Sequence, residues 1–532
     1  MRRSPRSLWS LGLAAALAGC AHDRVVVTAA DGPAPPRVER PGLLRAHLRA
    51  RARARRHAPS SRPQLLPHGT PAIQQPHPEW SAPDHAHELP ATIKRRGEQL
   101  LLLHGSRLLV VSLADLRLLA SVDVGHLFRP TLLVHGDQVL VLGSTLHRRV
   151  YQLHSVQRFR VAADGALARL RPLRLRSRLG GLTSHARLVG DALVLQIQGL
   201  IGARTPDLLE LPQILRRGAW HPLVRAADLQ RPIVAADGVH VRVRCGLDDL
   251  ECDAIGIVAP PAVFLTSDAD ASFVWTRREV YRFPFADAPV TAVRVPGRPL
   301  DLLAWRLRDG DLEAALVTDD GDALVRLPAP LLRAGLASSG PAHLRPLAPR
   351  AHEDAPARFV GDRLLRADAP DWACRGGSRL RIHTLAAPAV VDLAVPHCIS
   401  RIEPVGAAVA LVAAAEHDPT DVVSLTTLDP AAATLGETRT YTDVEPSRLR
   451  ADGPYRLSAD ASSVALPPRG DAPLRLLRFD GPRIDERSAP GGGDPELAFS
   501  VDGRLFVVRG DHLRELAEAD LRELRRLDLG PR

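Results

Sequence analysis

From about residue 88 onward, short apolar runs alternate with polar turns along most of the chain. The runs are about four to seven residues long and include Leu100–Leu103, Leu108–Val111, Val139–Leu142 and Leu505–Val508. Asp-Gly steps, which tolerate the positive φ angles of two-residue hairpin turns, separate many of them. These steps stand at residues 164–165, 237–238, 309–310, 320–321, 452–453, 480–481 and 502–503. The pattern predicts an all-β domain of antiparallel hairpins.

The two ends of this domain carry the same sequence pattern. Gly105-Ser-Arg-Leu108 and Ala114-Asp-Leu-Arg117 have counterparts at identical spacing in Gly510-Asp-His-Leu513 and Ala519-Asp-Leu-Arg522. Taken alone, residues 511–529 could form an amphipathic helix, because Leu residues recur there at helical spacing. The N-terminal copy reads Leu-Leu-Val-Val-Ser-Leu, which favours a strand. We therefore predict a strand hairpin at both ends.

Matching antiparallel units at both ends of an all-β domain favour a β-propeller. Juxtaposing the first and last units closes a ring and removes exposed sheet edges. Residues 88–532 would hold seven or eight blades at roughly 45–60 residues per blade. A pair of stacked β-sandwiches is the alternative.

The first 19 residues show the pattern of a secretory signal. Arg2, Arg3 and Arg6 precede a short apolar run that ends in Leu17-Ala-Gly-Cys20. A cysteine directly after Leu-Ala-Gly matches the bacterial lipobox, in which the thiol is lipidated and the signal removed. The run is too short to span a bilayer. We predict lipidation at Cys20; an ordinary signal peptide with a chance cysteine is the alternative.

Residues 20–87 have the composition of a flexible, disordered linker. They are rich in proline and show little hydrophobic periodicity, so we expect an extended, mobile chain. A cluster of arginines in this segment could contact the phosphates of a membrane surface. It comprises Arg45, Arg49, Arg51, Arg53, Arg55 and Arg56. A solvated linker in an arginine-biased protein is the alternative interpretation.

The net charge of +10 is concentrated before residue 63. The rest of the chain is about neutral, which argues against nucleic-acid binding by the globular body. Lys94 is the only lysine and asparagine is absent, so we attribute part of the arginine content to a GC-rich genome.

Four cysteines follow Cys20. An even number of cysteines in an exported chain predicts disulfides, and local pairing is the simplest of three connectivities. This pairing joins Cys245 to Cys252 and Cys374 to Cys398. Zinc binding is the alternative, although neither spacing matches a C-x2-C knuckle.

The start of the domain resembles a known bacterial family. Glu88-Leu-Pro-Ala-Thr-Ile-Lys-Arg-Arg-Gly97, followed by an apolar strand, is similar to the entry motif of secreted proteins that carry a C-terminal β-propeller, many of them lipoproteins. Arg96 replaces the aspartate of that motif's turn. Ser184 to Asp191 and Ser272 to Trp275 resemble the beginnings of later blades. The family has no established activity, so the resemblance implies fold and location only.

No catalytic fingerprint occurs in the sequence, and we predict no cofactor and no dedicated metal site. Two acidic clusters are candidates for calcium, which prefers oxygen ligands. They are Asp248, Asp249, Glu251 and Asp253, and Asp319, Asp320 and Asp322. A cysteine-closed surface loop and a hairpin turn are the simpler interpretations. Four tryptophans, Trp220, Trp275, Trp305 and Trp372, could pack between blades or line a recognition surface.

Together these features predict a lipid-anchored protein of the cell envelope, in the outer membrane of a Gram-negative bacterium. Its propeller, a monomeric body, would serve as a non-catalytic module that binds an envelope protein or a polysaccharide. One alternative is a periplasmic propeller enzyme of the hydrolase or quinone-dependent dehydrogenase type. Another is an accessory factor in outer-membrane protein assembly.

Overall fold

The computed structural model consists almost entirely of β-strands. Two short helical segments lie among them, α2 (Ala329–Arg333) and η3 (Pro341–His343). The structure describes residues 92–530 apart from 148–150, 179–183, 201–210, 226–228, 231–237, 261, 263, 268–269, 301–303, 349–355, 369–376, 388, 415–421, 445–462, 467, 471, 490–496, 502–503 and 518. The predicted signal, Cys20, the linker with its arginine cluster, and Cys374 lie outside these residues.

Hydrogen bonds arrange the described strands into nine sheets, numbered here in chain order. Sheet 1 contains β1 (Ile93–Arg96), β2 (Gln99–His104), β3 (Arg107–Ser112) and β4 (Arg117–Asp123). Sheet 2 contains β5 (Phe128–His135), β6 (Gln138–His147), β7 (Tyr151–Val161), β8 (Leu167–Arg169), β9 (Leu173–Arg178), β12 (Gln213–Arg216) and β13 (Ala219–Pro222). Sheet 3 contains β10 (Ser184–Val189), β11 (Ala192–Leu200), β14 (Leu229–Gln230), β15 (Gly238–Gly246) and β16 (Cys252–Ala259).

The next three sheets are mainly antiparallel, with one parallel pair of strands in sheet 4. Sheet 4 contains β17 (Phe264–Ser267), β18 (Ala271–Trp275), β19 (Glu279–Pro284), β20 (Thr291–Arg294) and β25 (Leu336–Ser338). Sheet 5 contains β21 (Gly297–Pro299), β22 (Trp305–Arg308), β23 (Asp311–Thr318), β24 (Gly321–Leu327) and β26 (Leu344–Pro346). Sheet 6 contains β27 (Ala357–Val360), β28 (Arg363–Asp368), β29 (Ser378–Thr384) and β30 (Val390–Val395).

The last three sheets lead back to the first. Sheet 7 contains β31 (Arg401–Val405), β32 (Ala408–Ala414), β33 (Val423–Asp429) and β34 (Thr434–Tyr441). Sheet 8 contains β35 (Ser463–Leu466), β36 (Leu474–Asp480) and β37 (Arg483–Ala489). Sheet 9 contains β38 (Leu497–Val501), β39 (Arg504–Arg509), β40 (His512–Leu516) and β41 (Glu523–Asp528).

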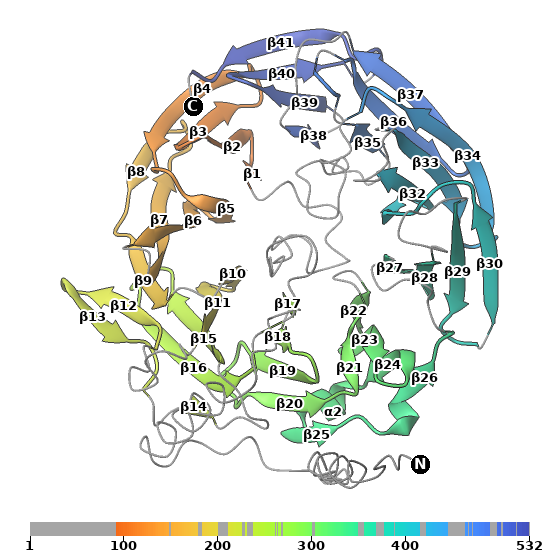
Figure 1. The fold of residues 1–532 in the computed structure, drawn as a ribbon. Coiled ribbons are helices and arrows are strands. Elements are labelled where there is room, and N and C mark those ends of the chain that lie inside the picture. Colours follow the sequence, from red (N-terminus) through yellow and green to blue (C-terminus); the bar gives the residue numbers. More distant parts are fainter. Residues whose placement is uncertain are drawn as a thin grey trace, which may run out of the picture.

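The sheets stand in a ring, as predicted for a β-propeller (Figure 1). Hydrophobic clusters fill the spaces between consecutive sheets, beginning with the cluster of Leu101, Val110 and Val139 between sheets 1 and 2. The same arrangement recurs at each later step around the ring. Another cluster joins sheet 9 to sheet 1 through residues such as Phe506 and Leu100. Apolar burial between flat faces, roughly 25 cal/mol per Å², is therefore the main attraction between neighbouring sheets.

The predicted seven or eight blades are fewer than the nine sheets of the described residues. The nine sheets include short ones, in which few residues form all the strands. Sheet 1 and sheet 9, for example, each complete four strands within about thirty residues, because short turns join their strands.

Two excursions of the chain link neighbouring sheets. After β11 of sheet 3 the chain returns to sheet 2 and adds the hairpin β12–β13 to its outer edge, beside β9. Similarly, the chain leaves sheet 5 after β24, adds β25 to the outer edge of sheet 4 beside β20, and returns to sheet 5 at β26. Sheet 2 thereby reaches seven strands, whereas sheet 1 beside it has four.

The terminal repeat forms a hairpin of the same geometry at both ends, which confirms the strand prediction over the helical alternative. Gly105 and Gly510 make equivalent tight turns at φ of 56° and 52°. Leu116 and Leu521 occupy the left-handed region at φ of 52° and 55°, and both copies contain a register shift before this turn. Sheets 1 and 9 are each complete from their own consecutive strands, so no strand is exchanged between them.

Arginines form polar links across many of the interfaces. Arg242 of sheet 3 donates to the carbonyl oxygen of Ala286 in sheet 4 at 3.1 Å, and Arg358 of sheet 6 reaches Glu403 in sheet 7 at 2.7 Å. Arg345 of sheet 5 donates to three carbonyl oxygens of sheet 6. Whatever its mutational origin, the arginine content thus has a structural use, because one guanidinium can serve several carbonyl acceptors.

Candidate functional site

The outer strands of sheet 2 carry a strong local excess of positive charge. Residues 151–178 contain seven arginines and one aspartate, in a domain that is about neutral as a whole. On β9 the sequence Leu-Arg-Leu-Arg alternates apolar and basic residues, so one face of the strand is apolar and the other cationic.

The two faces of these outer strands meet different surroundings. Leu173, Leu175 and Ile214 pack into the cluster shared with sheet 3. Alternation turns Arg174 and Arg176 to the opposite face, the one that sheet 1 covers at β6 and β7. Because sheet 1 has only four strands, β9, β12 and β13 extend outward beyond it (Figure 1).

Trp220 is the aromatic centre of this surface. It lies on β13 opposite Leu215 of β12, and its side chain is half-buried. The guanidinium of Arg176 stacks over the indole ring, 4.5 Å from its centroid, and donates to Oε1 of Gln213 at 2.7 Å. The stack holds the indole in a fixed orientation on an otherwise polar face.

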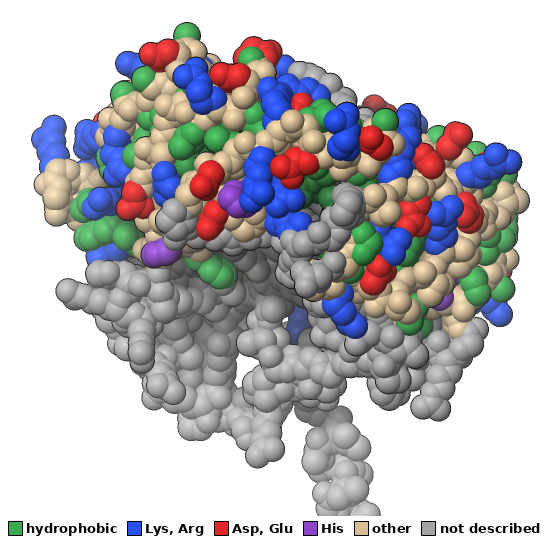
Figure 2. All heavy atoms as spheres, turned by 90° about the horizontal axis from the view of Figure 1, so that it is seen from above, with side chains coloured by type: hydrophobic (Ala, Val, Ile, Leu, Met, Phe, Trp, Pro, Cys, Tyr) green, Lys and Arg blue, Asp and Glu red, His purple; other side chains and the backbone are tan. Residues whose placement is uncertain are grey.

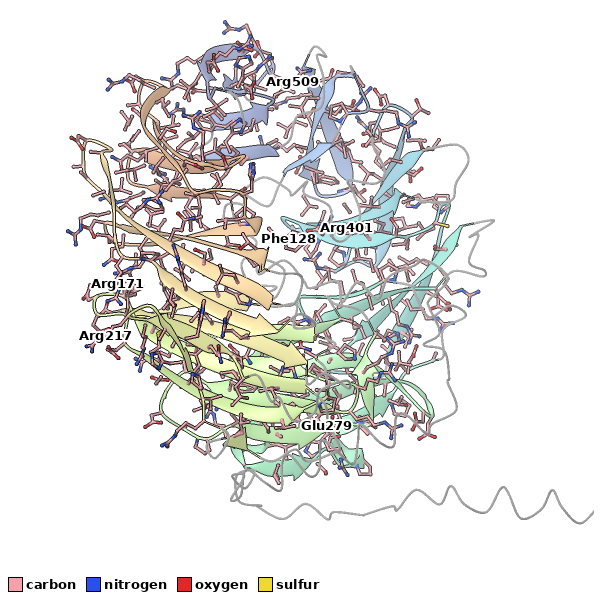
Figure 3. The ribbon with its side chains drawn as sticks, turned by 60° about the vertical axis from the view of Figure 1, so that its left-hand side comes forward. Phe128, Arg171, Arg217, Glu279, Arg401 and Arg509 are labelled. Carbon is pink, nitrogen blue, oxygen red and sulfur yellow. A yellow bond between two sulfur atoms is a disulfide. The ribbon has the colours of Figure 1, made fainter. Side chains whose placement is uncertain are left out.

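The tip of the hairpin presents a further arginine. Arg217 and Gly218 form the two-residue turn between β12 and β13 with φ of 49° and 81°, the signature of a type I′ turn. Glycine or asparagine is the ordinary choice for the first position, so Arg217 adopts a backbone conformation that costs it free energy. Figure 3 shows Arg171 and Arg217 at the same outer side of the molecule, away from Phe128 near the central opening.

We name the surface formed by Arg171, Arg174, Arg176, Arg217 and Trp220 the basic shelf. Among the described residues, Arg171, Arg174 and Arg217 are exposed and their guanidinium groups have no hydrogen-bond or ion-pair partner. Elsewhere acidic and basic side chains are interspersed, as on the face seen in Figure 2. The shelf therefore combines unpaired cations with an aromatic anchor, the composition that dominates binding energy at interfaces.

The shelf also ends in a free strand edge. β13 is the outermost strand of sheet 2 and pairs only with β12 among the described strands. In the antiparallel alternation, Arg216 and Ala219 close the turn, so the backbone N–H and C=O of Trp220 point away from β12. An extended peptide could bond to this edge as an added strand.

Cys245 and Cys252 form a disulfide within sheet 3, as the local pairing predicted. They face each other across β15 and β16 with Cα atoms 4.1 Å apart. Cys398 is also disulfide-bonded.

The acidic loop closed by this disulfide contacts sheet 2. Arg158 donates to the carbonyl oxygen of Leu247, Gln138 to Asp248 at 3.3 Å, and Arg216 pairs with Glu251 at 3.4 Å. Burial lowers the pKa of Arg158, an effect that the nearby carboxylate of Asp248 opposes. The first acidic cluster thus lies in a disulfide-closed surface loop of sheet 3 that contacts sheet 2.

The second acidic cluster is divided among different partners. Asp319 pairs with Arg278 of sheet 4 at 2.7 Å, and the buried Asp322 pairs with Arg366 of sheet 6 at 3.0 Å. Among the residues that the structure describes, no three His, Cys, Asp or Glu side chains are placed to hold a metal ion. The carboxylates of this turn tie sheet 5 to its two neighbours.

The near-zero net charge of the whole domain conceals the local charge of the shelf. Alternating Leu and Arg on β9 was a usable signal, but the position of Trp220 beside it depends on the excursion of β12–β13. Trp275 and Trp305 are buried between sheets 4 and 5, whereas Trp220 lies on the shelf. Trp372 lies outside the described residues.

None of the helices in the described part of the chain is long and apolar enough to cross a membrane.

Comparisons with known proteins yield only distant structural likeness. No protein-family model and no curated protein matches the chain. Among solved structures, the dihydro-heme d1 dehydrogenase NirN is 11% identical with a TM-score of 0.37, covering 79% of this chain and 78% of that one. AztD from Citrobacter koseri is 10% identical with a TM-score of 0.35, covering 80% and 93%. A eukaryotic initiation factor is 9% identical with a TM-score of 0.39, covering 83% and 89%.

Proposed function

We propose that this protein is a non-catalytic binding module of the cell envelope, anchored through a lipidated Cys20 and tethered by residues 21–87. The proposed partner is an envelope protein with an extended acidic segment, bound at the basic shelf. The single observation that supports this role is the group of unpartnered guanidiniums of Arg171, Arg174 and Arg217 around the half-buried Trp220.

A protein partner fits the shelf better than a polysaccharide because of the free edge of β13. The backbone N–H and C=O of Trp220 can each bond to a polypeptide strand, and Pro222, the next residue on this edge, adds its C=O. Acidic side chains of that strand would alternate toward Arg174 and the tip of the hairpin. Electrostatic attraction of this kind raises the rate of association and makes it sensitive to salt.

The test is affinity capture from detergent-solubilised envelopes, followed by binding measurements with the purified partner. The full chain is compared with a shelf variant, R171E/R174E/R217E, and a control, R117E/R522E/R526E, which changes net charge equally on sheets 1 and 9. The proposal predicts a protein that wild type and control retain and that the shelf variant loses, with affinity falling as salt is raised.

Two results would contradict this proposal. If all three proteins capture the same partner equally, the shelf is not the binding surface. If the captured material survives protease but is removed by polysaccharide digestion, the partner is a glycan. The anchor is tested separately by metabolic labelling with a fatty-acid analogue, which should mark wild type and leave Cys20→Ser unlabelled.

A further inference from the structure

A pocket of about 470 Å³ opens between sheets 5 and 6, in a different part of the ring from the basic shelf. Its volume is in the range of small-ligand sites. Arg306, Glu313 and Arg326 of sheet 5 form one wall, while Asp362 and Leu385 come from turns of sheet 6. At this interface Nη1 of Arg306 on β22 donates to the carbonyl oxygen of Gly361, in the turn between β27 and β28 of sheet 6.

Two of the arginines in the wall are already neutralised. Nε of Arg306 donates to Glu313 at 2.6 Å, and the side chains of both residues are only 11% exposed. Arg326 makes two hydrogen bonds to Asp311, at 2.8 and 3.0 Å. These pairs define the wall but leave little charge for a ligand.

Among the described residues Arg345 has no carboxylate partner, whereas Arg308 forms an ion pair with the exposed Asp309. Arg345 is half-buried, and its Nη1 donates to the carbonyl oxygens of Thr384, Leu385 and Ala387. These neutral acceptors do not cancel its charge. Arg308 lies 3.8 Å from Asp309, whose side chain is 93% exposed. Solvent screens this carboxylate and that of Asp362, which is 68% exposed, so the half-buried Arg345 contributes most to the potential inside the pocket.

His343 adds a neutral donor. The backbone N–H of Gly340 donates to Nδ1 of His343 at 3.0 Å, so the neutral ring carries its proton on Nε2. The pocket thus offers two guanidiniums and an imidazole N–H, and its lining contains no aromatic side chain other than this imidazole. A ligand here would be recognised by charge and hydrogen bonds rather than by stacking.

We propose that this pocket binds the carboxylate of a small, singly charged organic acid, through Arg345, Arg308 and Nε2 of His343. The inference is independent of the proposed role of the shelf. Guanidinium groups match a carboxylate in a planar, two-point geometry. The carboxylate could belong to a sugar acid or to the C-terminus of a short peptide.

Ligand-observed NMR with the full chain tests the proposal with five probes. These are D-glucuronate, N-acetyl-alanyl-alanine, their uncharged amide forms, and inorganic phosphate. We expect at least one acid to bind, its amide to bind at least tenfold more weakly, and phosphate not to compete. Binding of only one acid identifies the source of the carboxylate. Binding of neither acid at millimolar concentration, or tighter binding of phosphate, would overturn the proposal.

Variants locate the site. Arg308→Gln should weaken binding of the acid about tenfold with no loss of folding, because this side chain is 59% exposed. His343→Phe should weaken it severalfold by removing the N–H donor. Arg379→Gln on sheet 6, whose side chain is 60% exposed, is the control and should bind as wild type does. Equal affinity in all four proteins would show that the acid binds elsewhere.

Discussion

Arginine has different surroundings at the seam between sheets 9 and 1 and on the basic shelf. At the seam, Arg504 donates to the carbonyl oxygen of Leu113 at 2.9 Å, Arg525 to that of Ala114 at 2.6 Å, and Arg107 to that of Leu529 at 3.2 Å. On the shelf, Arg171 and Arg174 have no such partner among the described residues.

Both regions carry arginines on outer strands, and the difference between them lies in what faces these side chains. β9 reads Leu-Arg-Leu-Arg-Ser-Arg and β41 reads Glu-Leu-Arg-Arg-Leu-Asp. At the seam a neighbouring sheet supplies carbonyl acceptors, and Glu515 accepts from both Arg504 and Arg525. The shelf extends past its neighbour and receives none. An arginine is therefore structural or available for binding according to the width of the adjacent sheet.

The largest expected effect separates a buried interface arginine from a shelf arginine. The side chain of Arg366 is 0% exposed and pairs with Asp322, which is 6% exposed. Arg366→Met removes this buried ion pair from the Asp322 carboxylate, so we expect a loss of about 3–5 kcal/mol in the free energy of unfolding. Arg174→Met should change it by less than about 0.5 kcal/mol. Urea denaturation measures both.

The comparison of Arg366→Met with Arg174→Met also tests whether the interface arginines stabilise the ring. If Arg366→Met and Arg174→Met are equally mild, the interface arginines do not hold the sheets together. The double variant R366M/D322L, which removes both charges, should recover most of the loss.

Acid should weaken the interfaces of sheet 3 through buried histidines. Burial lowers the pKa of His154 and of His240 to about 4, from the ordinary 6.5. The neutral form is favoured in the folded state, so its stabilisation is present above pH 6.5 and is lost as pH falls through about 4. The total is about 3 kcal/mol for each fully buried histidine.

Denaturation of wild type and of His240→Gln across this pH range tests the assignment. In His240→Gln the free energy of unfolding should fall less steeply with decreasing pH than in wild type. The exposed control His221→Gln should show the wild-type dependence. An unchanged slope in His240→Gln would mean that His240 does not contribute to the acid sensitivity.

At the seam we expect an intermediate effect. Arg525→Ala removes the bond to Ala114 and one of the two arginines on Glu515, while Arg504 keeps the carboxylate paired. The expected loss is about 1.5–3 kcal/mol, the range for hydrogen bonds to charged groups. Arg522→Ala on the same sheet, with a side chain 72% exposed, is the matched control. If the two variants unfold at the same urea concentration, the seam does not depend on this link.

The smallest effect concerns the hairpin tip. Arg217→Gly should raise the free energy of unfolding by up to about 1 kcal/mol, because glycine adopts the left-handed turn without strain. The same change at Arg174, inside strand β9, should lower it by about 0.5–1 kcal/mol. Thermal unfolding of both variants shows whether each substitution raises or lowers the stability. A loss at Arg217 would mean that its side chain stabilises the hairpin.

Local patterns predicted the strands and turns but not the width of the sheets. Asp309-Gly310 forms the turn between β22 and β23, and Gly481 begins the turn between β36 and β37; the sequence requirement of such turns is confined to two residues. β12 pairs directly with β9, although β10 and β11 lie between them in the sequence. Short-range periodicity carries no information about such long-range pairing. The sequence therefore does not predict that Trp220 lies on this surface, although it does show the alternating leucines and arginines of β9.

The seam between sheets 9 and 1 also has a consequence for how the chain reaches its native state. Each of these sheets is made from its own consecutive strands, so sheet 1 can form its hydrogen bonds as soon as Asp123 has left the ribosome or export channel. Its face with Leu100, Leu102 and Leu109, however, packs against sheet 9. That apolar face stays open until translation or export delivers the last strands. During this interval it is a binding site for holdase chaperones and a point where two nascent chains can aggregate.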